Sequence, residues 1–167
     1  RVVNDCVRDM EKPFAMARLV QGDVGSGKTI VALLASAYAS LSGYQSAVMT
    51  PTEILAVQHY NNFKKTLSPF GIRVELLTGS MTAREKNLMQ ERIYLGLVDI
   101  VIGTHAVISK GVKFKNLSFV CIDEQHRFGV RQREILANKG HNPHVLVMSA
   151  TPIPRSLSLV LYGDLDI

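Results

Sequence analysis

The stretch Gly22-Asp23-Val24-Gly25-Ser26-Gly27-Lys28-Thr29 decides the fold of this chain. It matches the pattern G-x-x-x-x-G-K-[ST]. It lies between a short apolar run, Arg18 to Gln21, and a stretch rich in alanine and leucine, Thr29 to Leu41. A glycine-rich loop between a strand and a helix is the context in which this pattern cradles phosphates. The sequence therefore predicts a phosphate-binding loop at the start of an α/β domain.

The residue types of this loop suit a polyphosphate. Glycines at positions 22, 25 and 27 let the backbone turn tightly with its N–H groups facing inward. The first turn of the next helix adds unpaired amides and a favourable dipole. We expect Lys28 to reach the β- and γ-phosphates of ATP and the Thr29 hydroxyl to bind Mg²⁺. The alternative, a glycine-rich turn with an exposed lysine, is disfavoured by the flanking strand and helix.

Six short β-rich runs alternate with helix-like stretches, which is typical of βαβ units around a parallel sheet. Thr29 to Leu41 stops at a glycine, Thr52 to Leu67 has apolar residues at helical spacing, and Thr82 to Glu85 is a capping box whose helix runs to about Gly96. We expect one domain over residues 1–167, with helices flanking a mainly parallel sheet. The predicted strands are Arg18–Gln21, Ser46–Thr50, Val74–Leu77, Ile100–Ile102, Phe119–Ile122 and Val145–Met148.

Bulk composition sets broad limits on the kind of protein. The formal charge of +5 and the pI near 9.4 suit a polyanionic partner, although the basic residues are scattered along the chain. Cys6 and Cys121 are far apart and have no metal-ligand spacing, so we expect two buried thiols in a reducing compartment. No apolar run approaches the roughly 20 residues that span a bilayer, and we expect a cytoplasmic protein without membrane contact.

Two adjacent carboxylates, Asp123 and Glu124, directly follow the apolar run Phe119 to Ile122. This position predicts that both carboxylates lie at the carboxyl edge of the sheet, where ligands of open α/β sheets bind. Neighbouring residues of an extended chain point in different directions. We therefore expect Asp123 to hold the Mg²⁺ shell, largely through water, and Glu124 to orient and deprotonate a water for attack on the γ-phosphate. Lys28, Asp123 and Glu124 are the predicted catalytic residues.

Further motifs resemble one family. Asp123-Glu124-Gln125-His126 is similar to the DExH motif of superfamily-two helicases, and Ser149-Ala150-Thr151 to their Ser-Ala-Thr motif. Together with GDVGSGKT, the longer stretches DEQHRFGVRQR and MSATPIPRSL resemble the RecG family of branched-DNA helicases over essentially the full chain. The resemblance implies a RecA-like P-loop NTPase lobe that uses ATP and Mg²⁺. It also implies that five residues couple phosphate state to a second lobe: Gln125, His126, Ser149, Ala150 and Thr151.

The same resemblance implies a path for nucleic acid. Pro51 to Ala56 resembles the family's motif Ia, and Gly103-Thr104-His105 resembles its Ib segment. Helix caps and strand-end turns explain these residues equally well. Hydroxyl and amide contacts to phosphates would suit a motor that grips DNA without reading its sequence. The predicted DNA-binding residues are Pro51, Thr52, Glu53, Thr78, Gly79, Thr104 and His105. The sequence does not decide whether the arginines at 127, 131, 133 and 155 face DNA or a second lobe.

The family places an arginine finger in a second RecA-like lobe, and its wedge domain and glutamine motif lie upstream of Arg1. We therefore expect this piece alone to bind adenine nucleotide weakly and to turn it over negligibly. Three alternatives remain open: a transcription-repair coupling translocase, a replication-restart helicase, and a nucleotide-binding module without motor function. A GTPase is disfavoured, because His141 stands where the Asn138-Lys139 sequence would need a base-reading aspartate.

Overall fold

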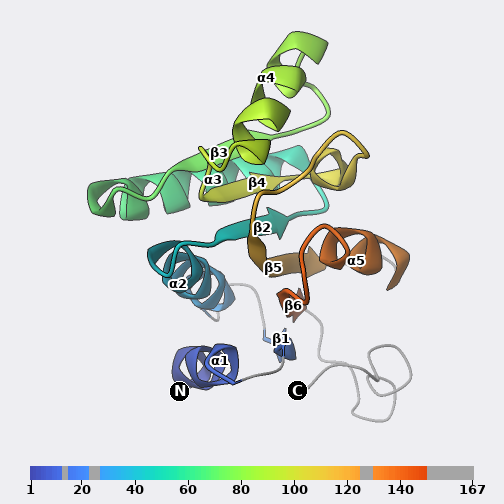
Figure 1. Cartoon of the computed structure of the whole chain (residues 1–167). Coiled ribbons are helices and arrows are strands. Elements are labelled where there is room, and N and C mark those ends of the chain that lie inside the picture. The colour runs from blue at the N-terminus through green and yellow to red at the C-terminus, as the bar shows by residue number, and fades with distance from the viewer. Residues whose placement is uncertain (13–14, 23–26, 125–129, 150–167) are drawn as a thin grey trace.

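A six-stranded, all-parallel sheet forms the centre of the molecule (Figure 1). The computed structural model describes residues 1–12, 15–22, 27–124 and 130–149. The strand order across the sheet is β1-β6-β5-β2-β4-β3, so the first and last strands of the described chain are neighbours. The strands are β1 (Ala17–Gln21), β2 (Gln45–Met49), β3 (Val74–Leu77), β4 (Ile100–Gly103), β5 (Leu117–Glu124) and β6 (His144–Ser149).

Helices cover both faces of the sheet and complete three layers. Side chains of α1, α2 and α3 pack with Val48, Phe119 and Cys121 in one buried cluster. Side chains of α4, α5 and the short 3-10 helix η2 pack with Met49 and Ile122 in a second cluster. Successive strand residues alternate between the two clusters because side chains of a strand point to opposite faces. The helices are α1 (Val2–Met10), α2 (Lys28–Leu41), α3 (Glu53–Leu67), α4 (Ala83–Tyr94), α5 (Val130–Ala137), η1 (Ser68–Phe70) and η2 (His105–Ile108).

Local capping residues set the ends of the predicted helices. Thr82 and Glu85 form the expected capping box of α4, with the Thr82 hydroxyl accepting from the Glu85 N–H and the Glu85 carboxylate accepting from the Thr82 N–H. Thr52 caps α3 by accepting from the Leu55 N–H at 3.3 Å. Gly43 follows α2 with φ of 87°, a conformation that glycine adopts without strain. All six predicted strands and these three helices are therefore confirmed.

Two α-helices of the described chain were not predicted from the sequence. α1 packs beside α2 through Cys6 and the partly buried Val3 and Met10. α5 contributes the fully buried Leu136 to the opposite face. α5 is only eight residues long and gives a weak isolated signal. In α1, Val3, Cys6 and Met10 recur at helical spacing, and this local pattern could have indicated the helix. Tertiary packing rather than propensity stabilises helices of this length.

Gln45 joins four segments at the amino end of β2. Its amide nitrogen donates to the carbonyls of Ile93 and Val98, both at 2.9 Å. Its amide oxygen accepts from the N–H groups of Lys115 at 2.9 Å and Asn116 at 3.0 Å. The side chain is 3% exposed, so every hydrogen-bonding position of a buried amide is used. This network ties the end of α4 to the start of β5.

Cys6 and Cys121 are both buried free thiols, as predicted, and burial raises the pKa of each, most strongly at Cys121.

Gly103 ends β4 against its neighbour β3: a Cβ at this position would lie 1.8 Å from the Leu77 carbonyl oxygen. Among the described helices, none is long and apolar enough to cross a membrane.

Candidate nucleotide-binding site

The carboxyl ends of β1, β6 and β5 lie side by side, and the predicted phosphate-binding residues follow them. Gln21 pairs with Ser149 across β1 and β6, and Ser149 pairs with Glu124 across β6 and β5. Because one strand separates β1 from β5, the backbone before the loop and the acidic pair are about 10 Å apart, two strand spacings. The fold therefore brings the predicted loop and the predicted acidic pair to one edge of the sheet.

Lys28 lies at the first position of α2 and turns back toward this edge. Its Nζ donates to the carbonyl oxygens of Gly22 and Ser149, the latter at 3.3 Å. The Gly22 N–H also donates to the Ser149 carbonyl, at 3.1 Å. Gly27 caps the helix with φ of 84°, which requires glycine for an unstrained turn. The Ser149 carbonyl thus connects both ends of the predicted phosphate-binding loop to β6.

The surroundings of Lys28 fit an anionic ligand. Among the described side chains, no carboxylate forms an ion pair with this partly buried ammonium group, which donates to two neutral carbonyl oxygens. A cation with only neutral neighbours retains strong attraction for a phosphate. The start of α2 adds the positive end of a 14-residue helix at the same place. These residues can hold the phosphates of a nucleotide.

Asp123 extends from β5 toward the face that carries α2 and α3. Phe119 and Cys121, which share its side of the strand, belong to the cluster packed under these helices. The Asp123 side chain is 18% exposed, and its Oδ2 lies 3.1 Å from Nε2 of His59 on α3. Thr29, in the first turn of α2, is on the same face. A hydroxyl and a carboxylate are suitable ligands for Mg²⁺ or for its bound waters, so the two residues fit the predicted metal site.

Part of the predicted site lies outside the described residues. This applies to four loop residues, to Gln125 and His126, and to Ala150 and Thr151; of Glu124 only the backbone is described. The loop residues concerned are Asp23, Val24, Gly25 and Ser26. The roles assigned to these side chains stay predictions. Ser149, the remaining coupling residue, is 3% exposed and lies between β1 and β5.

The predicted DNA-contact residues follow β2, β4 and β3, and so lie at the same carboxyl edge farther along the sheet. Glu53, Gly79 and His105 are exposed, Pro51 and Thr52 are partly exposed, and Thr78 and Thr104 are buried. Thr52 acts as a helix cap, as the structural alternative proposed. Glu53 Oε1 accepts from the Ser80 N–H at 2.9 Å, joining α3 to the turn after β3. Nucleic-acid contact by these seven residues stays a prediction.

Arg133 differs from the other candidate arginines. It lies on α5 with 6% of its surface exposed, so its side chain is buried within this domain. Arg131, on the same helix, is exposed. Of these two arginines, Arg131 therefore remains the candidate for an external partner. Arg127 and Arg155 lie outside the described residues.

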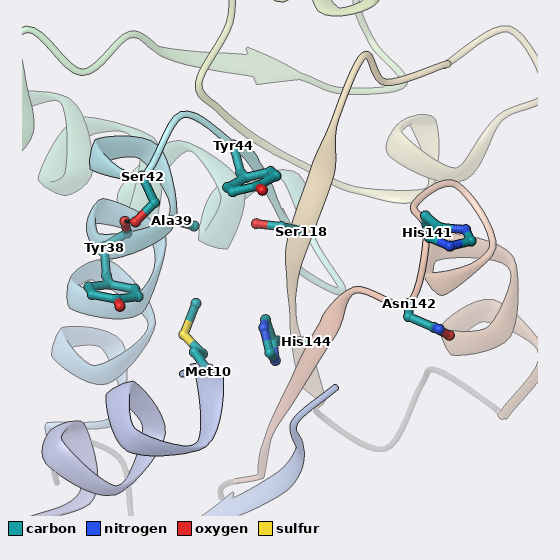
Figure 2. Close-up of a pocket in the computed structure, with 9 residues that line it drawn as sticks. All are labelled: Met10, Tyr38, Ala39, Ser42, Tyr44, Ser118, His141, Asn142 and His144. Carbon is teal, nitrogen blue, oxygen red and sulfur yellow. Dashed lines mark hydrogen bonds between the residues drawn. The ribbon is translucent and has the colours of Figure 1, made fainter. Parts of the chain in front are cut away.

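A cavity of about 380 Å³ lies at the opposite, amino edge of the sheet (Figure 2). Its lining includes Tyr38 and Ser42 at the end of α2, Ser118 at the start of β5 and His144 at the start of β6. Concave sites of this size are common places for ligands. The Lys28 and Asp123 chemistry is at the other end of these strands, so the cavity is separate from the candidate nucleotide site.

His59 is the residue of this site that the sequence did not reveal as functional. In the sequence it falls at helical spacing with Leu55, Phe63 and Leu67, a pattern that indicates only the packed side of a helix. The side chain is indeed mostly covered, at 12% exposed, but its polar end meets Asp123. A histidine among apolar residues at helical spacing was the available signal, and its partner is 64 positions away.

The fold and the site define a nucleotide-binding α/β domain of the P-loop class. A model of the DEAD/DEAH box helicase family matches residues 5–160. The chain belongs to this family.

Similarity to individual proteins is also high. ATP-dependent DNA helicase RecG of Aquifex aeolicus is 54% identical, over 100% of this chain and 21% of that protein. The Thermotoga maritima protein of the same name is 57% identical, over 94% of this chain and 20% of that protein. A solved structure of RecG bound to a three-way DNA junction superposes with a TM-score of 0.85 at 50% identity, covering 99% of this chain and 22% of that one. The chain thus spans about a fifth of the length of these relatives, and the predicted RecA-like fold is confirmed.

Proposed function

We propose that this chain is the ATP-binding lobe of a DNA helicase that couples ATP hydrolysis to the remodelling of branched DNA, such as stalled forks and Holliday junctions. One observation supports the nucleotide site above all: Lys28 and Gly22 meet at the Ser149 carbonyl, next to the strand that carries Asp123 and Glu124. Identity of 50–57% to proteins named RecG supports the choice of branched DNA over other helicase substrates.

In this proposal each residue has a defined task. Lys28 and the amides of the Gly22–Thr29 loop bind the β- and γ-phosphates, and the helix dipole of α2 strengthens the interaction. Mg²⁺, when bound, would be held by Thr29 and Asp123 and would neutralise charge on the phosphates. Glu124 orients a water and accepts its proton during attack on the γ-phosphate. Gln125, His126, Ser149, Ala150 and Thr151 pass the phosphate state to a second RecA-like lobe.

The same proposal explains why turnover needs more than these residues. An arginine finger contributes about 10³ to 10⁵ in rate in comparable NTPases, and in this family a second lobe supplies it. The isolated chain is therefore expected to bind nucleotide weakly and to hydrolyse it negligibly. Robust DNA-stimulated ATP turnover from residues 1–167 alone, measured in a steady-state assay, would contradict this expectation.

The central test uses Lys28→Ala in a full-length protein carrying this chain. We expect loss of ATP-driven fork unwinding, because the phosphates lose their principal cation, while DNA binding persists through other residues. The rate of ATP hydrolysis by the unaltered protein is also measured in the presence of forked, duplex or single-stranded DNA, and the three rates are compared. Unwinding retained by the Lys28 variant would refute the assigned nucleotide site. Equal stimulation by all three DNAs would favour a translocase that does not select branched DNA.

A further inference from the structure

His59 and Asp123 form a contact that the proposed mechanism has not used. Nε2 of His59 lies 3.1 Å from Oδ2 of Asp123, which is hydrogen-bond distance. The two side chains are 12% and 18% exposed, so water competes little for either group. The contact joins the middle of α3 to the end of β5. It therefore places one side chain of α3 directly on the predicted metal ligand.

The position of the His59 ring is fixed by the helix and by its neighbours. One turn farther along α3, the Phe63 ring lies 6.3 Å away between centroids, tilted by 58°, and Phe63 is fully buried. At its amino end, α3 is capped by Thr52 and joined to the turn after β3 by the Glu53 contact with Ser80. The imidazole thus has little freedom to follow a moving carboxylate, and the carboxylate must adopt the orientation that the ring favours.

A metal-holding carboxylate needs such support. The residues that hydrogen-bond to metal ligands orient them, and their loss typically lowers metal affinity by about 10- to 100-fold. Asp123 is on the face of the sheet that carries Thr29, the other predicted metal residue. An Asp123 side chain turned away from this position would leave the Thr29 hydroxyl without its acidic partner. The contact through Oδ2 engages one carboxylate oxygen and aligns the whole group.

We propose that His59 is a positioning residue for the Mg²⁺ site: its Nε2–H donates to Asp123 Oδ2 and holds the carboxylate in the orientation that binds the Mg²⁺ shell. The inference rests on the proposed nucleotide site. His59 touches neither nucleotide nor metal in this arrangement, and it acts through Asp123. Helix α3 thereby links the Thr52–Glu53 end, predicted to face DNA, with the metal side of the nucleotide site.

The test compares two variants of His59 in a full-length protein carrying this chain. His59→Phe keeps the ring volume against Phe63 and removes the donor. His59→Gln keeps a terminal N–H at similar reach. Binding of a non-hydrolysable ATP analogue is measured by calorimetry in Mg²⁺ and in EDTA, and the ratio of the two dissociation constants gives the Mg²⁺ enhancement. We expect His59→Phe to reduce this enhancement about tenfold or more, with binding in EDTA changed less than about twofold.

Two comparisons decide the outcome. His59→Gln should restore the enhancement to within about threefold of the unaltered protein, a recovery that a purely packing role would not produce. In an Asp123→Asn background, His59→Phe should have no further effect, because the partner is already lost. His59→Leu replaces the phenylalanine variant should the latter unfold. Full enhancement in His59→Phe, or an equal deficit in His59→Gln, would overturn the proposal.

The controls separate this inference from the proposed function. Lys28→Ala should lose analogue binding both with Mg²⁺ and in EDTA, since it removes a phosphate contact rather than a metal contact. If the unaltered protein binds the analogue with clear Mg²⁺ enhancement but His59→Phe matches it, only the role of His59 is wrong. If the unaltered protein binds no analogue at all, the nucleotide site itself is wrong. If it binds the analogue without Mg²⁺ enhancement, the metal site is wrong. Either result refutes the inference.

Discussion

Replacing Gln45 by leucine should loosen one specific region of the domain. The change keeps the size of the side chain and removes four hydrogen bonds at once. The four partners differ in what they lose. The Ile93 carbonyl still accepts from the Gly96 N–H at 3.1 Å, and the backbone at Lys115 and Asn116 is near solvent. The Val98 carbonyl belongs to a residue that is 2% exposed and bears the largest loss.

The magnitude follows from these differences. An unsatisfied buried carbonyl costs about 1–3 kcal/mol, and each partly compensated hydrogen bond about 0.5 kcal/mol. The greater apolar character of leucine returns about 1 kcal/mol. The net loss is about 1.5–3.5 kcal/mol, which corresponds to local opening about 10- to 300-fold more frequent, since about 1.4 kcal/mol is a factor of ten.

Hydrogen–deuterium exchange of a full-length protein, followed by mass spectrometry, measures this opening region by region. We expect faster exchange in the segments around residues 93–99 and 113–117, with α2 little changed. The matched control is Ser46→Ala, the next residue of β2. Ser46 is fully buried, and within the described part of the chain its hydroxyl makes one long contact, 3.5 Å to the Ser36 carbonyl. Exchange in Gln45→Leu that is as slow as in Ser46→Ala would refute the reasoning.

Two further predictions concern stability. His144 accepts a hydrogen bond from the Met16 N–H at Nδ1, 2.8 Å away, and burial lowers its pKa against an opposing effect of Asp9. The folded-state pKa is thus below the unfolded value near 6.5, so unfolding takes up a proton in acid. The stabilisation is present above about pH 6.5 and is lost as the pH falls toward the folded-state pKa. Urea denaturation at pH 7.5 and 5.5 should show lower stability at the acidic pH, and His144→Asn, which keeps an acceptor without titrating, should reduce this loss; an equal loss in both proteins would contradict it. Gly103→Ala should destabilise by more than about 3 kcal/mol or prevent folding, because its Cβ would overlap the Leu77 carbonyl. The control is Gly43→Ala, at a left-handed position with open space, which should cost only about 1 kcal/mol. Equal soluble yield and equal melting temperature of the two variants would contradict the overlap expected at Gly103.

Several elements could be predicted because their signals are local. The run Val145 to Met148 is apolar throughout, as expected of a strand covered on both faces, and it lies within β6. The capping box at Thr82 depends on residues only three positions apart, and it is present as expected. Helix α1 could have been predicted from the helical spacing of Val3, Cys6 and Met10. Helix α5 escaped prediction because its stability depends on a surface supplied by distant parts of the chain. The functional role of His59 escaped for the same reason.

The sequence by itself determined the glycine-rich loop before Lys28, the acidic pair after an apolar strand and the alternation of strands and helices. These features depend on neighbouring residues, because steric and hydrogen-bonding preferences act over a few positions of the chain. Only the tertiary structure decided that β6 lies between β1 and β5, which makes the Ser149 carbonyl the common partner of Gly22 and Lys28. It also decided that His59 meets Asp123 and that Gln45 joins α4 to β5. Such contacts span tens of positions, and they depend on strand order and helix placement, which the packing of the whole core selects.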